Sequence, residues 1–466
     1  MAFLLFAALF FAGWPLMRLG RSRRWFYLTA ASFLFYGWWD WRFLMLITAS
    51  GLIDFAAGLL MARLPRLKKV FLVASILGNV GSLAVFKYLD FLIINVNAIG
   101  GLLGGTWRIP ATELILPIGI SFYTFQSMSY TIDIYRGKLQ PTRNVLHFFA
   151  YLSMFPQLVA GPIVRAADLL PQLAKQRRAG EAQRWAGLRL IAYGFFKKVV
   201  VADTIAPVVR EALSGQTPLE SCGYWWIVMA LFAYQIYCDF SGYSDIARGL
   251  GKWMGYEFPV NFNHPYIADS FQEFWRRWHI SLSTWFRDYV YIPLGGSRHG
   301  RFFAHGNMWL TMLISGLWHG AAWTFVIWAA GHAMMLSLER MTGWPKRLCA
   351  RPLGRHLATL LVFVLTTILW VFFVSRSFSQ AVAILTTMFN FSKLSTGWGG
   401  LISSKAINLT LLMMARQLYF HFGLDRLRWP AARPVARLIG PVGLAVLIAA
   451  CVLMRGPGST FIYFQF

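Results

Sequence analysis

Residues 358–374 read ATLLVFVLTTILWVFFV, a run of seventeen residues without a single charged side chain. A helix needs about 20 mainly apolar residues to cross the hydrocarbon core of a bilayer. Uncharged runs also cover Met1 to Leu16 and Leu438 to Met454. These runs predict membrane-spanning helices.

The composition of the whole chain agrees with a membrane environment. Of its 466 residues, 57% are hydrophobic and 13% are charged, with a mean hydropathy of +0.52. Soluble domains carry about 25% charged residues. No hydrophilic block is long enough for a soluble domain, so we predict one membrane domain over residues 1–466.

Basic residues outnumber acidic ones by 44 to 18, which gives a net charge of +26. We do not attribute this charge to nucleic-acid binding, because the basic clusters fall between apolar segments, as they do in cytoplasmic loops that face anionic lipid. The clusters lie at 18–24, 63–69, 136–143, 175–184, 346–355 and 426–437. Loops poor in Lys and Arg, such as 97–105 and 214–223, separate some of them. Windows of roughly 19 residues predict about eleven spans.

Two segments are poor candidates for simple spans. The runs Asn307 to His319 and Gly320 to Leu338 are each short for a full crossing, which favours a hairpin that ends within the membrane. Phe148 to Val164 contains Pro156, Gly161 and Pro162, which favours a bent or re-entrant element.

The segment Ser270 to Gly296 reads SFQEFWRRWHISLSTWFRDYVYIPLGG. Ser270 and Glu273 form an S-x-x-E capping box, which predicts a helix start. Apolar residues then recur every three or four positions, which predicts one helix lying at the membrane interface. His279 falls at the edge of this stripe, where it either faces a cavity or fills a structural place beside tryptophan.

His319 lies within a long apolar region, in the sequence SGLWHGAAW that begins at Ser315. An ionisable group at such depth is a functional candidate, although a structural histidine bonded between helices is the alternative. Ser315 shares its helical face, and Gly316 and Gly320 allow another backbone to approach. A neutral imidazole here can act as a general base. We interpret His332, further along, as structural.

A third polar group follows the apolar run 225–237. Asp239 and Asp245 need partners or water at this place, and Arg248 is a local candidate partner. The four cysteines are not spaced for zinc or disulfides, so no metal site is predicted. Motifs for nucleotide binding and for a nucleophilic serine are absent from the sequence.

Five segments of the chain resemble the membrane-bound O-acyltransferase (MBOAT) family, in particular its bacterial branch of alginate O-acetyltransferases. They are LPIGISFYTFQSMSYTIDIYRG (116–137), FPQLVAGPIVR (155–165), YCDFSGYSDIARGLG (237–251), FWRRWHISLSTWFRDYVYIPLGG (274–296) and LWHGAAWTF (317–325). The resemblance implies an all-α polytopic fold, with re-entrant and interfacial helices around a central tunnel.

The same resemblance implies which residues act. The family's deep histidine falls on His319, as general base, and its second histidine falls on His279. For the tunnel lining we take six candidates: Tyr237, Asp239, Asn263, Arg277, Ser281 and Trp318. The acyl donor would be a cytoplasmic thioester, either acetyl-CoA or an acyl carrier, and no cofactor would be bound.

The resemblance further implies multi-pass insertion in the bacterial inner membrane and contact with lipid. Periplasmic partner proteins would pass the acetyl group to an exopolysaccharide such as alginate, so this chain would serve the polymer indirectly. Alternatives within the family are transfer of D-alanine and acetylation of peptidoglycan or cellulose. An alternative of another class is a polysaccharide exporter or channel without catalysis.

Overall fold

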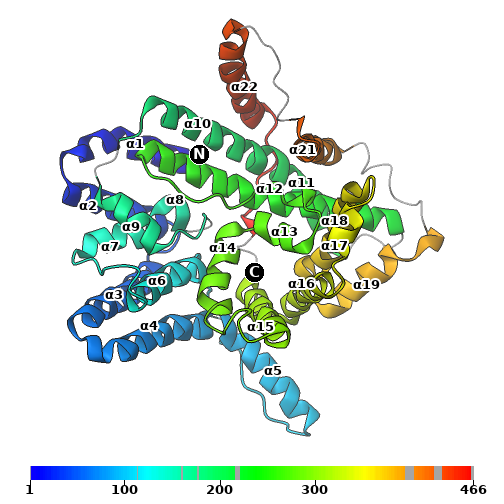
Figure 1. Ribbon diagram of the computed structural model, residues 1–466, viewed down its shortest axis with the longest axis horizontal. Helices are drawn as coiled ribbons and strands as arrows, with labels where there is room; N and C mark the ends of the chain where they lie inside the picture. Colours follow the sequence, from blue (N-terminus) through cyan, green and yellow to red (C-terminus); the bar gives the residue numbers. More distant parts are fainter. Residues whose placement is uncertain are drawn as a thin grey trace. The chain divides into compact units, whose positions relative to one another are not determined.

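The computed structural model describes residues 2–112, 114–158, 161–175, 178–215, 221–393, 404–424 and 433–462. Every regular element in these ranges is a helix, as Figure 1 shows. The predicted all-α class is therefore confirmed for this part of the chain. Some sequence features fall partly outside it, including the basic clusters at 175–184 and 426–437, the loop at 214–223 and the segment Phe148 to Val164.

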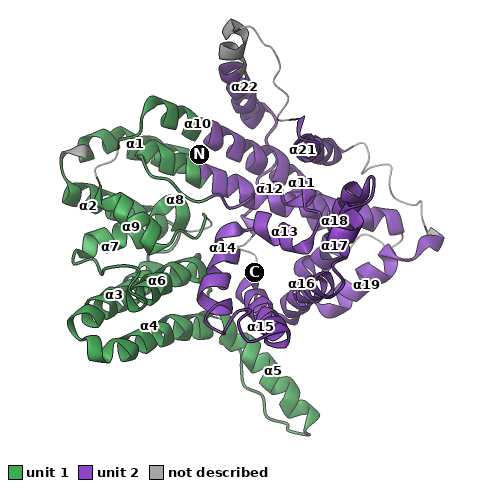
Figure 2. Ribbon diagram, viewed as in Figure 1, with its two compact units in different colours: residues 1–188, 247–259 green, residues 189–246, 260–466 purple. Residues whose placement is uncertain are grey.

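The chain divides into two compact units (Figure 2), and the boundary between them falls within two long helices, α10 (Glu181–Phe195) and α12 (Cys222–Met254). Unit 1 holds residues 1–188 and 247–259. Its other helices are α1 (Ala2–Gly13), α2 (Arg21–Gly37), α3 (Arg42–Arg63), α4 (Lys68–Leu83), α5 (Leu89–Leu102), α6 (Ile120–Tyr135), α7 (Val145–Leu152), α8 (Phe155–Leu158) and α9 (Ala166–Ala174).

Unit 2 holds residues 189–246 and 260–466. Its other helices are α11 (Asp203–Leu213), α13 (Phe271–Arg277), α14 (Ile280–Phe286), α15 (Arg301–His319), α16 (Trp323–Thr342), α17 (Trp344–Cys349), α18 (Gly354–Val374), α19 (Phe378–Met388), α21 (Lys405–His421) and α22 (Arg433–Leu453). A π-helical turn, η4 (Phe196–Ala202), joins α10 to α11.

Three helical stretches of the described residues are long and apolar enough to cross a membrane. They are α3, the stretch Pro65–Leu102 that contains α4 and α5, and α18. The uncharged run at 358–374 thus lies within α18, as predicted. Shorter apolar helices cover Ala2–Met17, Phe378–Met388 and Gly440–Leu453. The count of about eleven spans stays a prediction.

A buried polar network ties together α3, α4 and α6 in unit 1. Asp54 on α3 is fully buried, and its carboxylate accepts hydrogen bonds from Ser75 and Asn79 on α4 and from Ser127 on α6. Buried polar groups need such partners, because each one left unsatisfied costs about 1–3 kcal/mol. The network therefore fixes how these three helices pack.

Both irregular segments have the broken form that the sequence predicts. The segment Phe148 to Val164 contains the end of α7, the single turn α8 and, from residue 161, non-helical chain. In unit 2, α15 and α16 pack against each other as a hairpin through the short connection at residues 320–322. Their depth in a membrane stays a prediction.

The prediction of one continuous helix from Ser270 is wrong. The helix ends at Arg277, Trp278 is extended, and His279 has a left-handed φ of 43° before α14 begins. Asn263 donates its N–H to the Arg277 carbonyl, and Ile280 donates to the Asn261 carbonyl, each at 2.9 Å. These two bonds satisfy backbone groups that a helix break would otherwise leave open. The apolar stripe persists because both short helices bury apolar side chains, such as Phe274 on α13 and Trp285 on α14, and the interfacial position stays a prediction.

Candidate active site

His319 is the last residue of α15, at the closed end of the α15–α16 hairpin. Its side chain is buried, with 3% exposure, and its ring lies 5.0 Å from Trp318, 5.1 Å from Trp328 and 5.5 Å from Phe373 between centroids. These rings come from α15, α16 and α18. Because aromatic walls exclude water, the imidazole sits where electrostatic interactions with a reacting group are strong.

Small residues allow this hairpin to close. A Cβ atom on Gly316 would lie 2.6 Å from both the Phe325 carbonyl oxygen and the Ala329 Cβ. One on Gly320 would overlap the Phe325 ring. Ser315, one turn before His319, is buried on the same helix. The close approach predicted from the spacing of these glycines is confirmed.

His279 sits at the break between α13 and α14 and is fully buried. Its Nδ1 lies 3.1 Å from the Asn261 side-chain oxygen, Oδ1. The same oxygen accepts the Ser281 backbone N–H at 3.2 Å and the Ser281 hydroxyl at 2.9 Å. His279 lies outside the candidate membrane spans, and burial lowers the pKa of its imidazole to about 3. The ring is therefore neutral at physiological pH.

Trp318 brings the two histidines into one aromatic cluster. Its ring centroid lies 5.0 Å from His319 and 6.2 Å from His279. His279 also packs against Phe240 at 4.6 Å and Phe262 at 6.1 Å. The two histidines, which the resemblance assigned to one site, thus both contact Trp318 within unit 2.

His332 on α16 is fully buried among aromatic side chains. Its ring stacks on Phe274 at 5.9 Å and meets Trp275 at 5.1 Å and Trp328 at 5.0 Å. Trp328 contacts both His332 and His319, so His332 packs behind one wall of the candidate site. Its interpretation as a structural histidine stays a prediction.

The six candidate lining residues separate into two groups. Tyr237, Asp239, Ser281 and Trp318 are buried in unit 2, with exposures of 2–4%. Ser281 joins the Asn261 network, whereas Asp239 accepts the backbone N–H of Ile462 at 2.7 Å and pairs with Lys198.

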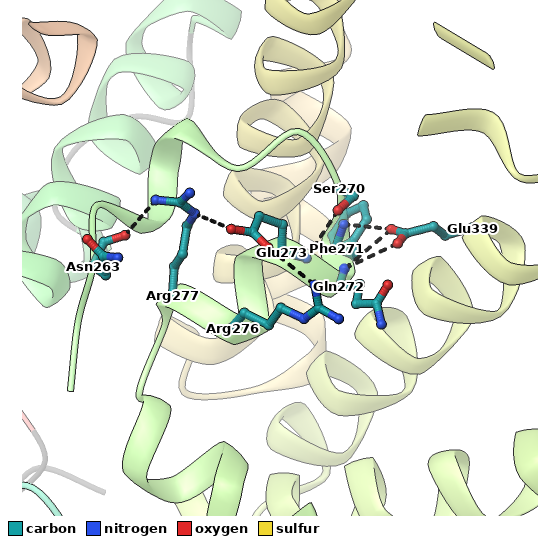
Figure 3. Close-up of polar contacts among 8 residues, drawn as sticks. All are labelled: Asn263, Ser270, Phe271, Gln272, Glu273, Arg276, Arg277 and Glu339. Carbon is teal, nitrogen blue, oxygen red and sulfur yellow. Dashed lines mark hydrogen bonds and ion pairs between the residues drawn. The ribbon is translucent and has the colours of Figure 1, made fainter. Parts of the chain in front are cut away.

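Asn263 and Arg277 have a different surrounding, which Figure 3 shows. The Asn263 carbonyl accepts a hydrogen bond from the Arg277 guanidinium at 3.1 Å, and Glu273 pairs with Arg277 at 2.7 Å. At the other end of α13, Ser270 caps the helix as predicted, accepting the Glu273 N–H at 3.1 Å. Glu339 on α16 accepts the Phe271 N–H at 2.6 Å and so holds α13 against α16.

The partners of the α12 carboxylates were missed by sequence reasoning. Lys197 Nζ lies 2.7 Å from Asp245, and Lys198 Nζ lies 2.7 Å from Asp239 and 2.9 Å from Asp203. Both lysines lie on the π-helical turn η4, which places consecutive side chains toward different carboxylates. Two lysines within the apolar run at 195–202 were the available signal, because charges in such a place need partners.

A cavity of about 650 Å³ lies elsewhere in unit 2, beside α11 and α19. Trp225, Arg376 and Gln380 contribute to its lining, and none of the candidate site residues does.

Comparison with known proteins decides the family. The model of the membrane-bound O-acyltransferase family matches residues 138–382, a range that contains His279, His319 and their contacts up to Phe373. The chain belongs to this family. It is therefore a membrane protein and an acyltransferase, and the resemblance seen in the five sequence segments is confirmed.

Individual MBOAT relatives extend this match over most of the chain. A probable alginate O-acetylase AlgI of Pseudomonas aeruginosa is 39% identical, covering 85% of this chain and 76% of the relative. One of Pseudomonas putida is 38% identical, covering 96% and 95%. A peptidoglycan O-acetyltransferase of Helicobacter pylori is 34% identical, covering 78% and 73%.

Proposed function

We propose that this MBOAT protein is an O-acetyltransferase of the bacterial inner membrane that serves an exopolysaccharide such as alginate. The similarity to alginate O-acetylases over up to 96% of the chain supports the acetyl group and the polymer. The observation that carries the catalytic part is the burial of His319 within an aromatic wall at the closed end of the α15–α16 hairpin.

In the proposed reaction, His319 acts as general base on an acceptor hydroxyl. The hydroxyl oxygen attacks the carbonyl carbon of the thioester, and its proton moves to the imidazole. The C–S bond then breaks, and the thiolate takes the proton from the imidazolium. One C–O bond forms as one C–S bond breaks, and the proton passes from the hydroxyl to the thiolate. No acyl-enzyme is needed. A neutral imidazole is needed at the start, which a dry aromatic surrounding favours.

The proposal includes the topology that the sequence predicts. About eleven spans and re-entrant elements surround a tunnel, in which a cytoplasmic thioester, acetyl-CoA or an acyl carrier, meets an acceptor from the opposite face. Such a tunnel would let the acetyl group cross the membrane while the donor stays inside. Periplasmic partner proteins would then carry the acetyl group to the polymer.

Peptidoglycan is the second candidate polymer, because the Helicobacter pylori relative at 34% identity is a peptidoglycan O-acetyltransferase. Deletion of the gene, followed by complementation, separates the two. We expect ester-linked acetyl in the exopolysaccharide to disappear in the deletion strain and to return with the wild-type chain. Loss of acetyl from peptidoglycan alone would reassign the polymer, and loss of ester-linked D-alanine would reassign the acyl group.

A further inference from the structure

The side chain of Asn261 is placed so that it decides which nitrogen of His279 carries the proton. A backbone N–H only donates, so the Asn261 atom that meets the Ser281 N–H at 3.2 Å is the amide oxygen. The other end of the amide, Nδ2, donates to the Ser244 hydroxyl at 3.1 Å. Both ends of the amide therefore have partners that fix its orientation.

This orientation has a consequence for His279. The same amide oxygen lies 3.1 Å from His279 Nδ1, and an amide oxygen can only accept a hydrogen bond. Nδ1 must therefore donate, and in a neutral imidazole the proton then resides on Nδ1 and the lone pair on Nε2. The Asn261, Ser281 and His279 side chains are each no more than 4% exposed, so water does not compete for these bonds.

The backbone supports a special role for this residue. His279 adopts φ 43°, a left-handed conformation that is uncommon for residues other than glycine and is found at functional sites. In this conformation the ring contacts Phe240 at 4.6 Å and Trp318 at 6.2 Å between centroids, and the Trp318 ring also contacts His319. The backbone conformation and the ring contacts of His279 together fix the position of its side chain.

We propose that Asn261 is a positioning residue, which holds His279 as the Nδ1–H tautomer so that Nε2 accepts a hydrogen bond from an N–H or O–H group of the substrate beside His319. This inference rests on the proposed function, because it takes the site of His319 as the site of acyl transfer. It adds a residue that the sequence analysis did not assign.

The charged groups on the elements packed around His279 have partners of their own. Asp239 and Asp245 on α12 pair with Lys198 and Lys197 on η4, and Arg277 on α13 pairs with Glu273. Further titratable groups on these elements include Tyr234, Tyr237, Cys238, Tyr243 and Arg248 on α12, Arg276 on α13, and His305 and His319 on α15. Burial is the main cause of the low pKa of His279, so a new carboxylate at position 261 would be its dominant charged neighbour.

The substitution Asn261→Asp tests this through the pH profile. A carboxylate against Nδ1 favours the imidazolium and raises the pKa of His279. Because Nε2 must carry a lone pair, activity is then present above the raised pKa and lost as pH falls through it. Wild type, with a pKa of about 3, should show no such limb from His279 between about pH 5.5 and about pH 9.

The assay is transfer of label from radioactive acetyl-CoA in inner-membrane vesicles, measured over that pH range. We expect Asn261→Asp to be at least about 10-fold less active at its acid end and to recover toward its alkaline end. Asn390→Asp is the matched control, because Asn390 is exposed and its side chain bonds only Ser392 among the described residues. A pH-independent loss in Asn261→Asp would overturn the proposal, because a purely structural role predicts that result.

A second measurement does not depend on activity. Nitrogen NMR of histidine-labelled protein in nanodiscs, with the His279 signal assigned from His279→Gln, reports the tautomer directly. We expect a protonated Nδ1 in wild type and a shift toward mixed tautomers in Asn261→Ala. A protonated Nε2 in wild type would overturn the inference even if His319→Gln shows that the acyltransferase proposal holds. Activity in His319→Gln would instead overturn the proposed function and leave the tautomer result to stand.

Discussion

Replacing Gly316 with alanine should force α15 and α16 apart and move His319. The added Cβ would lie 2.6 Å from the Phe325 carbonyl oxygen, whereas ordinary contacts begin at 3.4 Å, so the helices must separate by about 0.8 Å. Overpacking of this kind costs about 1–3 kcal/mol of unfolding free energy. A displacement of about 1 Å at a reacting group can reduce activity roughly 100-fold.

The matched control lies on the same helix. A Cβ on Gly306 would meet nothing within 4 Å, so Gly306→Ala should gain about 0.5–1 kcal/mol from the lower chain entropy of alanine and keep full activity. Thermal unfolding of both variants in detergent, together with acetyl transfer in membrane vesicles, compares the two effects. Equal unfolding midpoints and equal activities in the two variants would refute the packing of the hairpin described here.

Three further substitutions test other parts of the fold by thermal unfolding. Asp54→Ala should lower the midpoint, because it leaves buried donors unsatisfied at about 1–3 kcal/mol each; an unchanged midpoint would show that α3 does not depend on this network. Lys198→Met should cost about 3–5 kcal/mol and lower the midpoint more than Asp239→Asn, because it leaves both Asp239 and Asp203 without their cation, whereas Asp239→Asn leaves Lys198 paired with Asp203. An equal or smaller loss in Lys198→Met would contradict these pairings. Ser270→Ala should cost about 1 kcal/mol through loss of the α13 cap, and Ser270→Gly only a few tenths.

Local features of this fold were predictable because local chemistry determines them. The uncharged run at 358–374 is within α18, Ser270 caps α13, and Gly316 marks a close helix contact. Each depends on residues that are near in sequence, or on the absence of a side chain. The family follows from motifs of the same local kind.

Features that depend on contacts between distant segments were not predictable. The apolar stripe from Ser270 continues across the break at His279, because both short helices bury the same kind of face, and so periodicity alone cannot show the break. The bonds that hold the break come from Asn261 and Asn263, eighteen and sixteen residues before His279. Likewise, Asp239 forms an ion pair with Lys198, forty-one residues away, whereas the sequence analysis named only the nearby Arg248 as a candidate partner.

The most direct test of this account is acetyl transfer from radioactive acetyl-CoA by inner-membrane vesicles that contain wild type or His319→Gln at equal levels. Glutamine keeps much of the polar size of histidine but cannot accept a proton at neutral pH. We expect His319→Gln to unfold at the temperature of wild type and to transfer no label above background. Transfer at the wild-type rate would contradict the role of His319 as general base and would make His279 the next residue to test.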